Sequence, residues 1–119
     1  DIIKDNPESR HFCVFDELYS GTNPYEAISS ATSYLKYINK FDNVSFILTT
    51  HFMKICNLLK KDSKVENCHM KTTQQNDTLT YFYKMILGVS KIRGGISILR
   101  QLNYPDTLIS TAKNILNNI

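Results

Sequence analysis

The stretch that decides the fold reads Phe12-Cys13-Val14-Phe15-Asp16-Glu17. Four apolar residues run without a break and end in two acids, which is typical of a buried strand whose C-terminal end faces a site. The same residues also fit a turn or a helix cap, because motifs this short match by chance. The case for a functional site therefore depends on the residues that come after them in the chain.

The residues after this stretch predict a loop and then a helix. Asn23 can act as the N-cap, Pro24 fits the first helical position, and Glu26 stands three residues after the cap. Apolar residues then recur at helical spacing to about residue 39: Ala27, Ile28, Ala31, Leu35 and Ile38. The Gly and hydroxyl residues of the loop 19–24 suit an anion-binding helix N-terminus, and they suit simple capping equally well.

A second apolar run, 44–50, predicts another strand, with His51 just past its end and a helix continuing to about Lys61. Two strands joined by a long helical crossover predict a parallel βαβ unit. Ligands of such sheets bind beyond the carboxyl ends of the strands, where Asp16, Glu17 and His51 all fall. A histidine there can donate a hydrogen bond to a terminal phosphate, although a histidine that caps or packs on the next helix is the commoner case.

The rest of the chain changes character. Residues 65–72 and 79–87 predict an antiparallel hairpin around the polar stretch 73–77. Two helices are expected after it, separated by a break at 103–105. The predicted fold class is therefore α/β, with parallel strands and crossover helices first, then a β-hairpin and two C-terminal helices.

Composition bounds the possible functions. The 119 residues allow one domain or part of one, and 42% hydrophobic with 21% charged residues excludes collagen-like, mucin-like and acidic disordered chains. The net charge of +3 is too mild to indicate nucleic acid as a direct partner. No apolar run approaches the ~18 residues of a membrane helix, so no membrane partner is expected. The chain begins at Asp1 without a Met, as if cut from something longer.

Three cysteines, Cys13, Cys56 and Cys68, are an odd number at wide spacing, which predicts free thiols in a reducing, intracellular compartment. A zinc site that combines Cys56 and Cys68 with His51 and His69 fits no known ligand spacing.

The ordered motifs resemble one family. Residues 12–23 look like the Walker B strand and following D-loop of MutS, the DNA mismatch-repair ATPase, and Thr50-His51-Phe52 looks like its Thr-His-aromatic switch. Further matches come in the family's order: Val65-x-Asn67-x-His69, Gly88-x-Ser90-Lys91, Gly95-Ile96 with Pro105, and Ala112-Lys113-x-Ile115-Leu116. The resemblance covers about residues 12 to 116.

The chain departs from the family pattern in two places. Tyr19-Ser20-Gly21 stands where most members have Gly-Arg-Gly, and 92–95 replaces the usual Ser-Tyr-Gly stretch. These departures, together with a composition rich in Asn, Ile and Lys, suggest a divergent branch of viral or mitochondrial type.

The resemblance implies a role for each matching residue. Asp16 would support Mg²⁺ through water, Glu17 would be the general base for ATP hydrolysis, and His51 would sense the γ-phosphate of ATP. The D-loop at the nucleotide and dimer interface would be formed by Ser20, Gly21, Thr22 and Asn23.

The resemblance also implies an architecture. The chain would be the C-terminal half of an ABC-type P-loop ATPase domain: 12–61 would hold the Walker B strand, the D-loop and the His switch, 62–90 the hairpin, and 91–119 the dimerisation helices. The cofactors would be ATP and Mg²⁺. The partners would be a second MutS-type subunit, identical or related, and mismatched double-stranded DNA held by domains outside this chain.

The phosphate-binding motif G-x-x-x-x-G-K-[ST] is absent from the sequence. We expect it upstream of Asp1 and expect the isolated chain to be inactive. Two alternatives stay open at this point: a dimerisation module that does not hydrolyse ATP, and another ABC-type ATPase of the SMC or transporter kind. The last would carry an L-S-G-G-Q-like stretch shortly before Walker B, and residues 5–10 show none.

Overall fold

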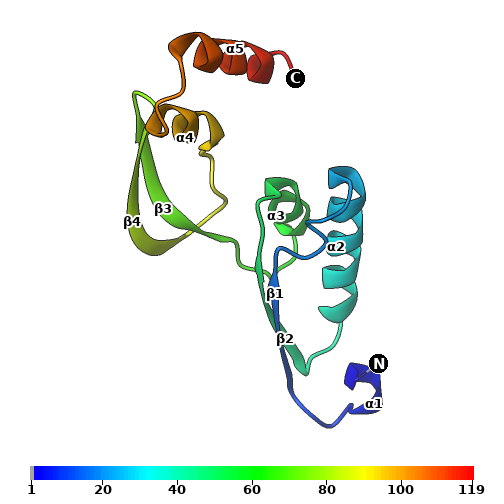
Figure 1. The fold of residues 1–119 in the computed structure, drawn as a ribbon. Helices are drawn as coiled ribbons and strands as arrows, with labels where there is room; N and C mark the ends of the chain where they lie inside the picture. Colours follow the sequence, from blue (N-terminus) through cyan, green and yellow to red (C-terminus); the bar gives the residue numbers. More distant parts are fainter. Residues whose placement is uncertain (1) are drawn as a thin grey trace. The chain divides into compact units, whose positions relative to one another are not determined.

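The computed structural model describes residues 2–119 and has the mixed α/β fold that the sequence predicts. By contacts it divides into two compact units, Asp1–Asn67 and Cys68–Ile119. The elements, labelled in Figure 1, are α1 (Ile2–Asp5), β1 (His11–Asp16), α2 (Pro24–Ile38), β2 (Val44–Thr49), α3 (Met53–Leu59), β3 (Cys68–Gln75), β4 (Thr78–Leu87), α4 (Gly95–Gln101) and α5 (Asp106–Asn117). Within residues 2–119, no helix combines the length and apolar character needed to cross a membrane.

In the first unit, β1 and β2 form a parallel two-stranded sheet linked through α2, which confirms the predicted βαβ unit. The register runs from His11 opposite Val44 to Asp16 opposite Thr49. Backbone hydrogen bonds extend the pairing beyond both ends, since His11 N donates to Asn43 O at 2.8 Å and Glu17 N donates to Thr49 O at 2.8 Å. The carboxyl ends of both strands therefore lie at one edge of the sheet.

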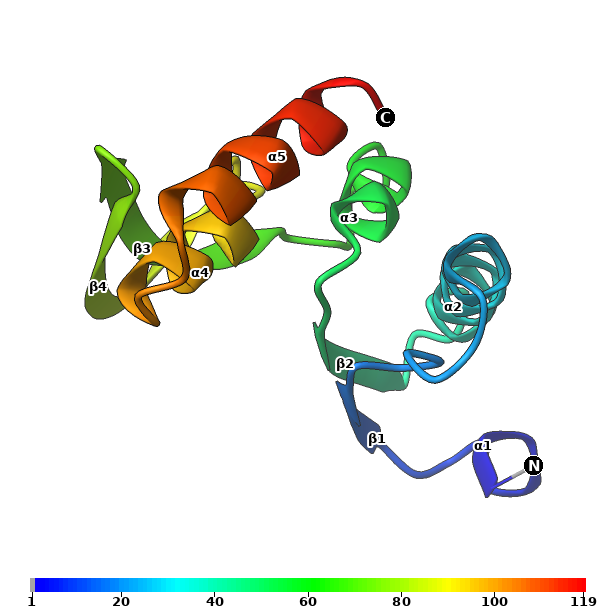
Figure 2. The same ribbon diagram turned by 45° about the horizontal axis from the view of Figure 1, so that its top comes forward.

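The core of this unit lies between the sheet and two helices. Figures 1 and 2 both show α2 and α3 on the same side of β1 and β2. Alternate strand residues, including Phe15, Phe46 and Leu48, pack against the buried helix residues: Ala31, Leu35 and Ile38 from α2, and Ile55 and Leu59 from α3. This alternation places one face of each strand in the core.

The other face of the sheet is open, which differs from the prediction of buried strands. Phe12 is 65% exposed, Val14 66% and Ile47 54%. The physical reason is that the helices of this unit cover a single face. The continuous apolar runs of the sequence therefore show that both faces are apolar, without showing that both are covered within this unit.

The start of α2 agrees with the sequence prediction. Asn23 is the N-cap, and its side-chain Oδ1 accepts a hydrogen bond from Tyr25 N at 2.9 Å. Pro24 occupies the first helical position, where its missing N–H costs nothing. The helix ends at Ile38, close to the predicted residue 39.

In the second unit, β3 and β4 form the predicted antiparallel hairpin with shifted bounds. The first strand begins at Cys68, and the turn contracts to Asn76-Asp77, whose φ angles of 51° and 64° are both left-handed. Asn and Asp tolerate this conformation better than other side chains, so the pair forms a tight hairpin turn inside the longer polar stretch. The ladder shifts register between Met70 and Thr72.

Polar contacts fix the hairpin to α4 and α5. Gln74 Nε2 donates to the hydroxyl of the fully buried Ser97 at 2.8 Å. At the hairpin turn, the Asp77 carboxylate accepts from Arg100 Nε at 3.2 Å and from Lys113 Nζ at 2.6 Å. One turn carboxylate thus joins the hairpin to both helices.

Candidate functional site

The two sequence-predicted acids lie where β1 ends. Asp16 is the last residue of the strand, and Glu17 follows it with a left-handed φ of 52°. This backbone conformation is uncommon for a residue other than glycine and costs roughly 1–3 kcal/mol. Because Glu17 N remains bonded to Thr49 O, the chain turns out of the sheet directly after Asp16 while staying anchored to β2.

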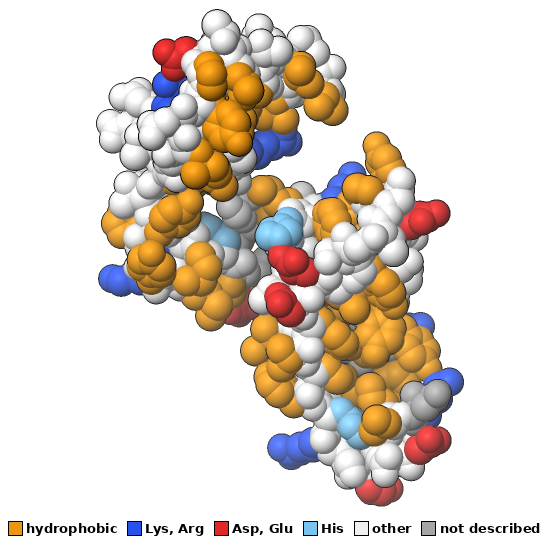
Figure 3. Space-filling view, in the orientation of Figure 1, with side chains coloured by type: hydrophobic (Ala, Val, Ile, Leu, Met, Phe, Trp, Pro, Cys, Tyr) orange, Lys and Arg blue, Asp and Glu red, His pale blue; other side chains and the backbone are white. Residues whose placement is uncertain are grey.

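The structure brings Glu17 and His51 together. His51 Nε2 contacts Glu17 Oε1, and the contact is an ion pair when the imidazole is protonated. The side chains are 79% exposed for His51 and 41% for Glu17, so water screens the pair and a ligand can reach both groups. In Figure 3, red acidic side chains gather beside a pale blue histidine at this end of the β1–β2 sheet.

Asp16 has a partner that the sequence reasoning missed. The Thr49 hydroxyl donates a hydrogen bond to Asp16 Oδ1, across the register pair at the ends of β1 and β2. The signal was present in the sequence, because Thr49 is a polar residue at the end of an apolar strand, opposite Asp16 in any in-register parallel pairing. The hydroxyl of the next residue, Thr50, accepts from Phe52 N at 3.0 Å and holds the turn that carries His51.

The loop between Glu17 and Asn23 is built from tight turns. Ser20 N donates to Glu17 O at 3.0 Å, and the Thr22 hydroxyl donates to Tyr19 O at 3.0 Å. A Cβ placed on Gly21 would meet nothing within 4 Å, so packing inside this chain does not require a glycine there. The structure thus connects these predicted D-loop residues directly to Glu17 on one side and to the α2 cap on the other.

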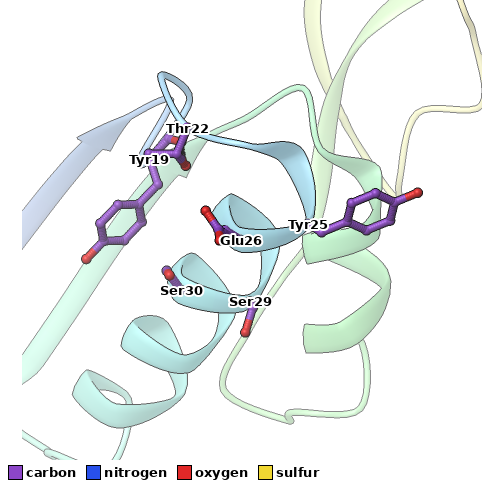
Figure 4. A pocket seen from close by; sticks show the side chains of 6 residues that line it. All are labelled: Tyr19, Thr22, Tyr25, Glu26, Ser29 and Ser30. Carbon is purple, nitrogen blue, oxygen red and sulfur yellow. Dashed lines mark hydrogen bonds between the residues drawn. The ribbon is translucent and has the colours of Figure 1, made fainter.

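An open hollow of about 520 Å³ lies beside this loop, on the first turns of α2. Figure 4 shows Glu26, Ser29 and Ser30 along one side of the helix, with Tyr19 and Thr22 on the preceding loop. Tyr25 completes the lining. The lining holds a carboxylate and no basic side chain, so the hollow does not suit the phosphates of a nucleotide.

The ends of β1 and β2 carry carboxylate and hydroxyl oxygens, the donor type that magnesium prefers. Among residues 2–119, no group of three or more His, Cys, Asp and Glu side chains could hold a metal ion. Burial also raises the pKa of the Cys56 thiol, which disfavours the thiolate that zinc requires. Mg²⁺ at nucleotide sites needs only one or two carboxylates beside phosphate and water ligands, and Asp16 is a carboxylate that could serve in this way.

Several motif residues have structural contacts. Asn67 Nδ2 donates to Cys56 O at 3.0 Å and so ties the end of the first unit to α3. His69 Nδ1 lies 2.8 Å from Gly88 O, across the base of the hairpin. Gly88 has a φ of 102°, a conformation that side chains rarely adopt, which explains a glycine at that position. The contacts of these residues therefore stabilise the fold.

The family model described as MutS domain V matches residues 1–119. The chain belongs to the MutS family. The MutS domain V chain is 32% identical to the DNA mismatch repair protein spellchecker 1 of Drosophila melanogaster, over 87% of this chain and 11% of that protein. It is 31% identical to the MutS protein of Orientia tsutsugamushi strain Ikeda, over 90% of this chain and 12% of that protein.

A third relative agrees with these two. The MutS protein of Lactococcus lactis subsp. cremoris strain SK11 is 28% identical over 93% of this chain and 13% of that protein. The chain thus spans roughly an eighth of the length of the curated relatives that it matches. The match confirms the family that the sequence motifs indicated, in the part that the family model calls domain V.

Proposed function

We propose that the MutS domain V chain supplies the carboxylates and the histidine of an ATP-hydrolysing site in a DNA mismatch repair protein. The observation that carries this proposal is the contact between Glu17 and His51, with Asp16 beside them at the same edge of a parallel sheet. The relatives are named as DNA mismatch repair proteins, which supports the same process for the protein that contains this chain.

The geometry suits phosphoryl transfer to water. The Glu17 carboxylate is partly exposed, so it can accept a proton from an attacking water. The exposed imidazole of His51 can donate a hydrogen bond to a terminal phosphate oxygen while remaining close to Glu17. Asp16 would hold Mg²⁺ through a water ligand, and the ion would neutralise charge on the phosphates when bound.

This chain offers one part of such a site. The backbone cradle and the lysine of a P-loop are absent from its sequence. The chain would therefore be the C-terminal half of an ABC-type P-loop ATPase domain, and another segment would supply the phosphate cradle. Ser20, Gly21, Thr22 and Asn23 would form the D-loop that faces the second subunit at a composite ATP site.

Exposed apolar side chains on the unit Cys68–Ile119 support the proposal of a second subunit. Large apolar side chains stand exposed on the hairpin and on the last helix: Met85, Leu87, Leu108, Ile115 and Leu116. Large apolar side chains left exposed in this way can mark an interaction site. We propose a MutS-type subunit, identical or related, as the partner, with mismatched double-stranded DNA held by other domains. The net charge of +3 is small for a chain that binds DNA phosphates directly, which agrees with DNA binding by other domains.

The test uses the intact MutS-type protein that carries this chain. Glu17→Gln removes the base and keeps the size of the side chain, so ATP turnover should fall at least about 100-fold while ATP binding changes less than about twofold. Glu26→Gln is the matched control, because it neutralises another exposed carboxylate, on α2, and should leave turnover intact. Unchanged hydrolysis in Glu17→Gln would exclude Glu17 as the base.

A second candidate function uses the same apolar surface without the chemistry. The chain would then be an assembly module that joins subunits and does not hydrolyse ATP. The Glu17→Gln experiment separates the two candidates, because the module predicts no ATP turnover in the unmodified protein and unimpaired assembly in the variant.

A further inference from the structure

Thr49 makes two contacts at the ends of β1 and β2 that none of the proposed roles explains. It is the last residue of β2 and stands opposite Asp16 in the register. Its hydroxyl donates to Asp16 Oδ1, and its backbone carbonyl accepts from Glu17 N at 2.8 Å. One residue of β2 is therefore bonded to both acids of β1, through its side chain to the first and through its backbone to the second.

We infer that Thr49 is a positioning residue that fixes the Asp16 carboxylate for its part in the nucleotide site. This inference rests on the proposed function, which gives Asp16 the task of holding Mg²⁺ through water. A donor on Oδ1 restricts rotation of the carboxylate and leaves Oδ2 for the water shell of a cation. Partners that orient a metal-supporting group in this way commonly change metal affinity about 10- to 100-fold when they are removed.

A purely structural role for Thr49 predicts something different. Both Asp16 and Thr49 are exposed on the open face of the sheet, so their hydrogen bond competes with water and adds little to stability. Valine has nearly the same shape as threonine and an equal preference for strands. Thr49→Val should therefore leave the fold intact while it frees the carboxylate to rotate.

The experiment measures the geometry and the metal response without relying on catalysis. Carboxyl-detected ¹³C NMR of the intact MutS-type protein with ADP bound, isotope-labelled at aspartate, reports the Asp16 side chain, and Mn²⁺, a paramagnetic substitute for Mg²⁺, broadens the signals of groups near it. In Thr49→Val the Asp16 carboxyl signal should move, and the Mn²⁺ concentration for half-broadening should rise by at least about tenfold. Thr49→Ser restores the hydroxyl and should return both values to within about twofold of the original chain.

Ser45→Ala is the matched control. Ser45 carries a hydroxyl on the same exposed face of the same strand, opposite Phe12 rather than an acid. Its removal should leave the Asp16 signal and the Mn²⁺ response unchanged. If Thr49→Val does not fold, as judged from its amide spectrum, Thr49→Ala takes its place in the comparison.

The outcomes separate the inference from the proposed function. Broadening at Asp16 that is equal in the original chain, Thr49→Val and Thr49→Ser would overturn the positioning role and leave the metal role of Asp16 standing. Failure of Thr49→Ser to restore the response would overturn it as well. No broadening at Asp16 in the original chain would contradict the metal role within the proposed function, and the positioning role would fall with it.

Discussion

Replacing Leu35 by alanine should remove much of the stability of the unit that carries the site. Leu35 lies in the last turn of α2, is 0% exposed and belongs to the core cluster with Ile38 and Ile55. Truncating a fully buried leucine to alanine costs about 3 kcal/mol, because both the transfer free energy and a cavity term are lost. A small unit with few fully buried side chains has a low free energy of unfolding, so a loss of this size is a large fraction of it.

The measurement is urea unfolding, followed by backbone amide signals of α2, β1 and β2, for the original chain and the variant. Leu58→Ala is the matched control, because Leu58 lies on α3 and is 43% exposed, so its truncation should cost less than about 1.5 kcal/mol. Equal losses in the two variants would refute the assignment of the core to the inner face of α2. Leu35→Ala should also disturb the packing of Phe15 and Leu48, the residues that directly precede Asp16 and Thr49.

Two further predictions concern the unit Cys68–Ile119. Its stability should fall in acid, because the hydrogen bond from Lys113, with help from Arg100, holds the pKa of Asp77 below its ordinary value. A carboxyl with a lowered folded-state pKa stabilises the fold above its unfolded pKa of about 3.9 and loses that contribution as the pH falls through the folded value. Thermal unfolding, followed as the pH is lowered from neutral through the unfolded pKa, should show a smaller acid-dependent loss in Asp77→Asn than in the original chain, and parallel profiles would contradict this. The other prediction tests the proposed subunit contact. Ile115 is 57% exposed on α5, so Ile115→Asp should weaken self-association of the intact protein at least about tenfold in sedimentation equilibrium, without unfolding it. Asn114→Asp adds the same charge at a neighbouring exposed position and serves as the control.

Much of the fold could be predicted because the deciding signals are local. The cap at Asn23, the helical spacing of Ala31 and Leu35, and the apolar runs that end at Asp16 and Thr49 each depend on a few adjacent residues. Parallel pairing is then a consequence of the long crossover, and it places Glu17 and His51 side by side. The roles of Asp16, Glu17 and His51 remain proposals, since they came from resemblance rather than from spacing.

Other features depend on contacts between distant residues, which local patterns do not encode. The hairpin turn contracted to Asn76-Asp77, and the sequence did not show that Asp77 would meet Lys113 from a later helix. The bond between Thr49 and Asp16 was missed although its signal was in the sequence, because a single threonine in a strand is common and its partner becomes clear only once the register is known. The open face of the sheet was missed because apolar composition does not say which segment covers it.

The register of two strands gives the proposed site its precision. A shift of one strand by one residue would move Asp16 off Thr49 and turn the core face of the shifted strand toward solvent. Phe15 and Leu48 prevent such a shift, because they are register partners and both face the core beneath α2 and α3. The next residues of the two strands, Asp16 and Thr49, therefore lie opposite each other on the other face of the sheet. Thus the apolar alternation that stabilises the unit also sets which hydroxyl reaches which carboxylate, and a substitution in the core at either position should disturb the acids without touching them.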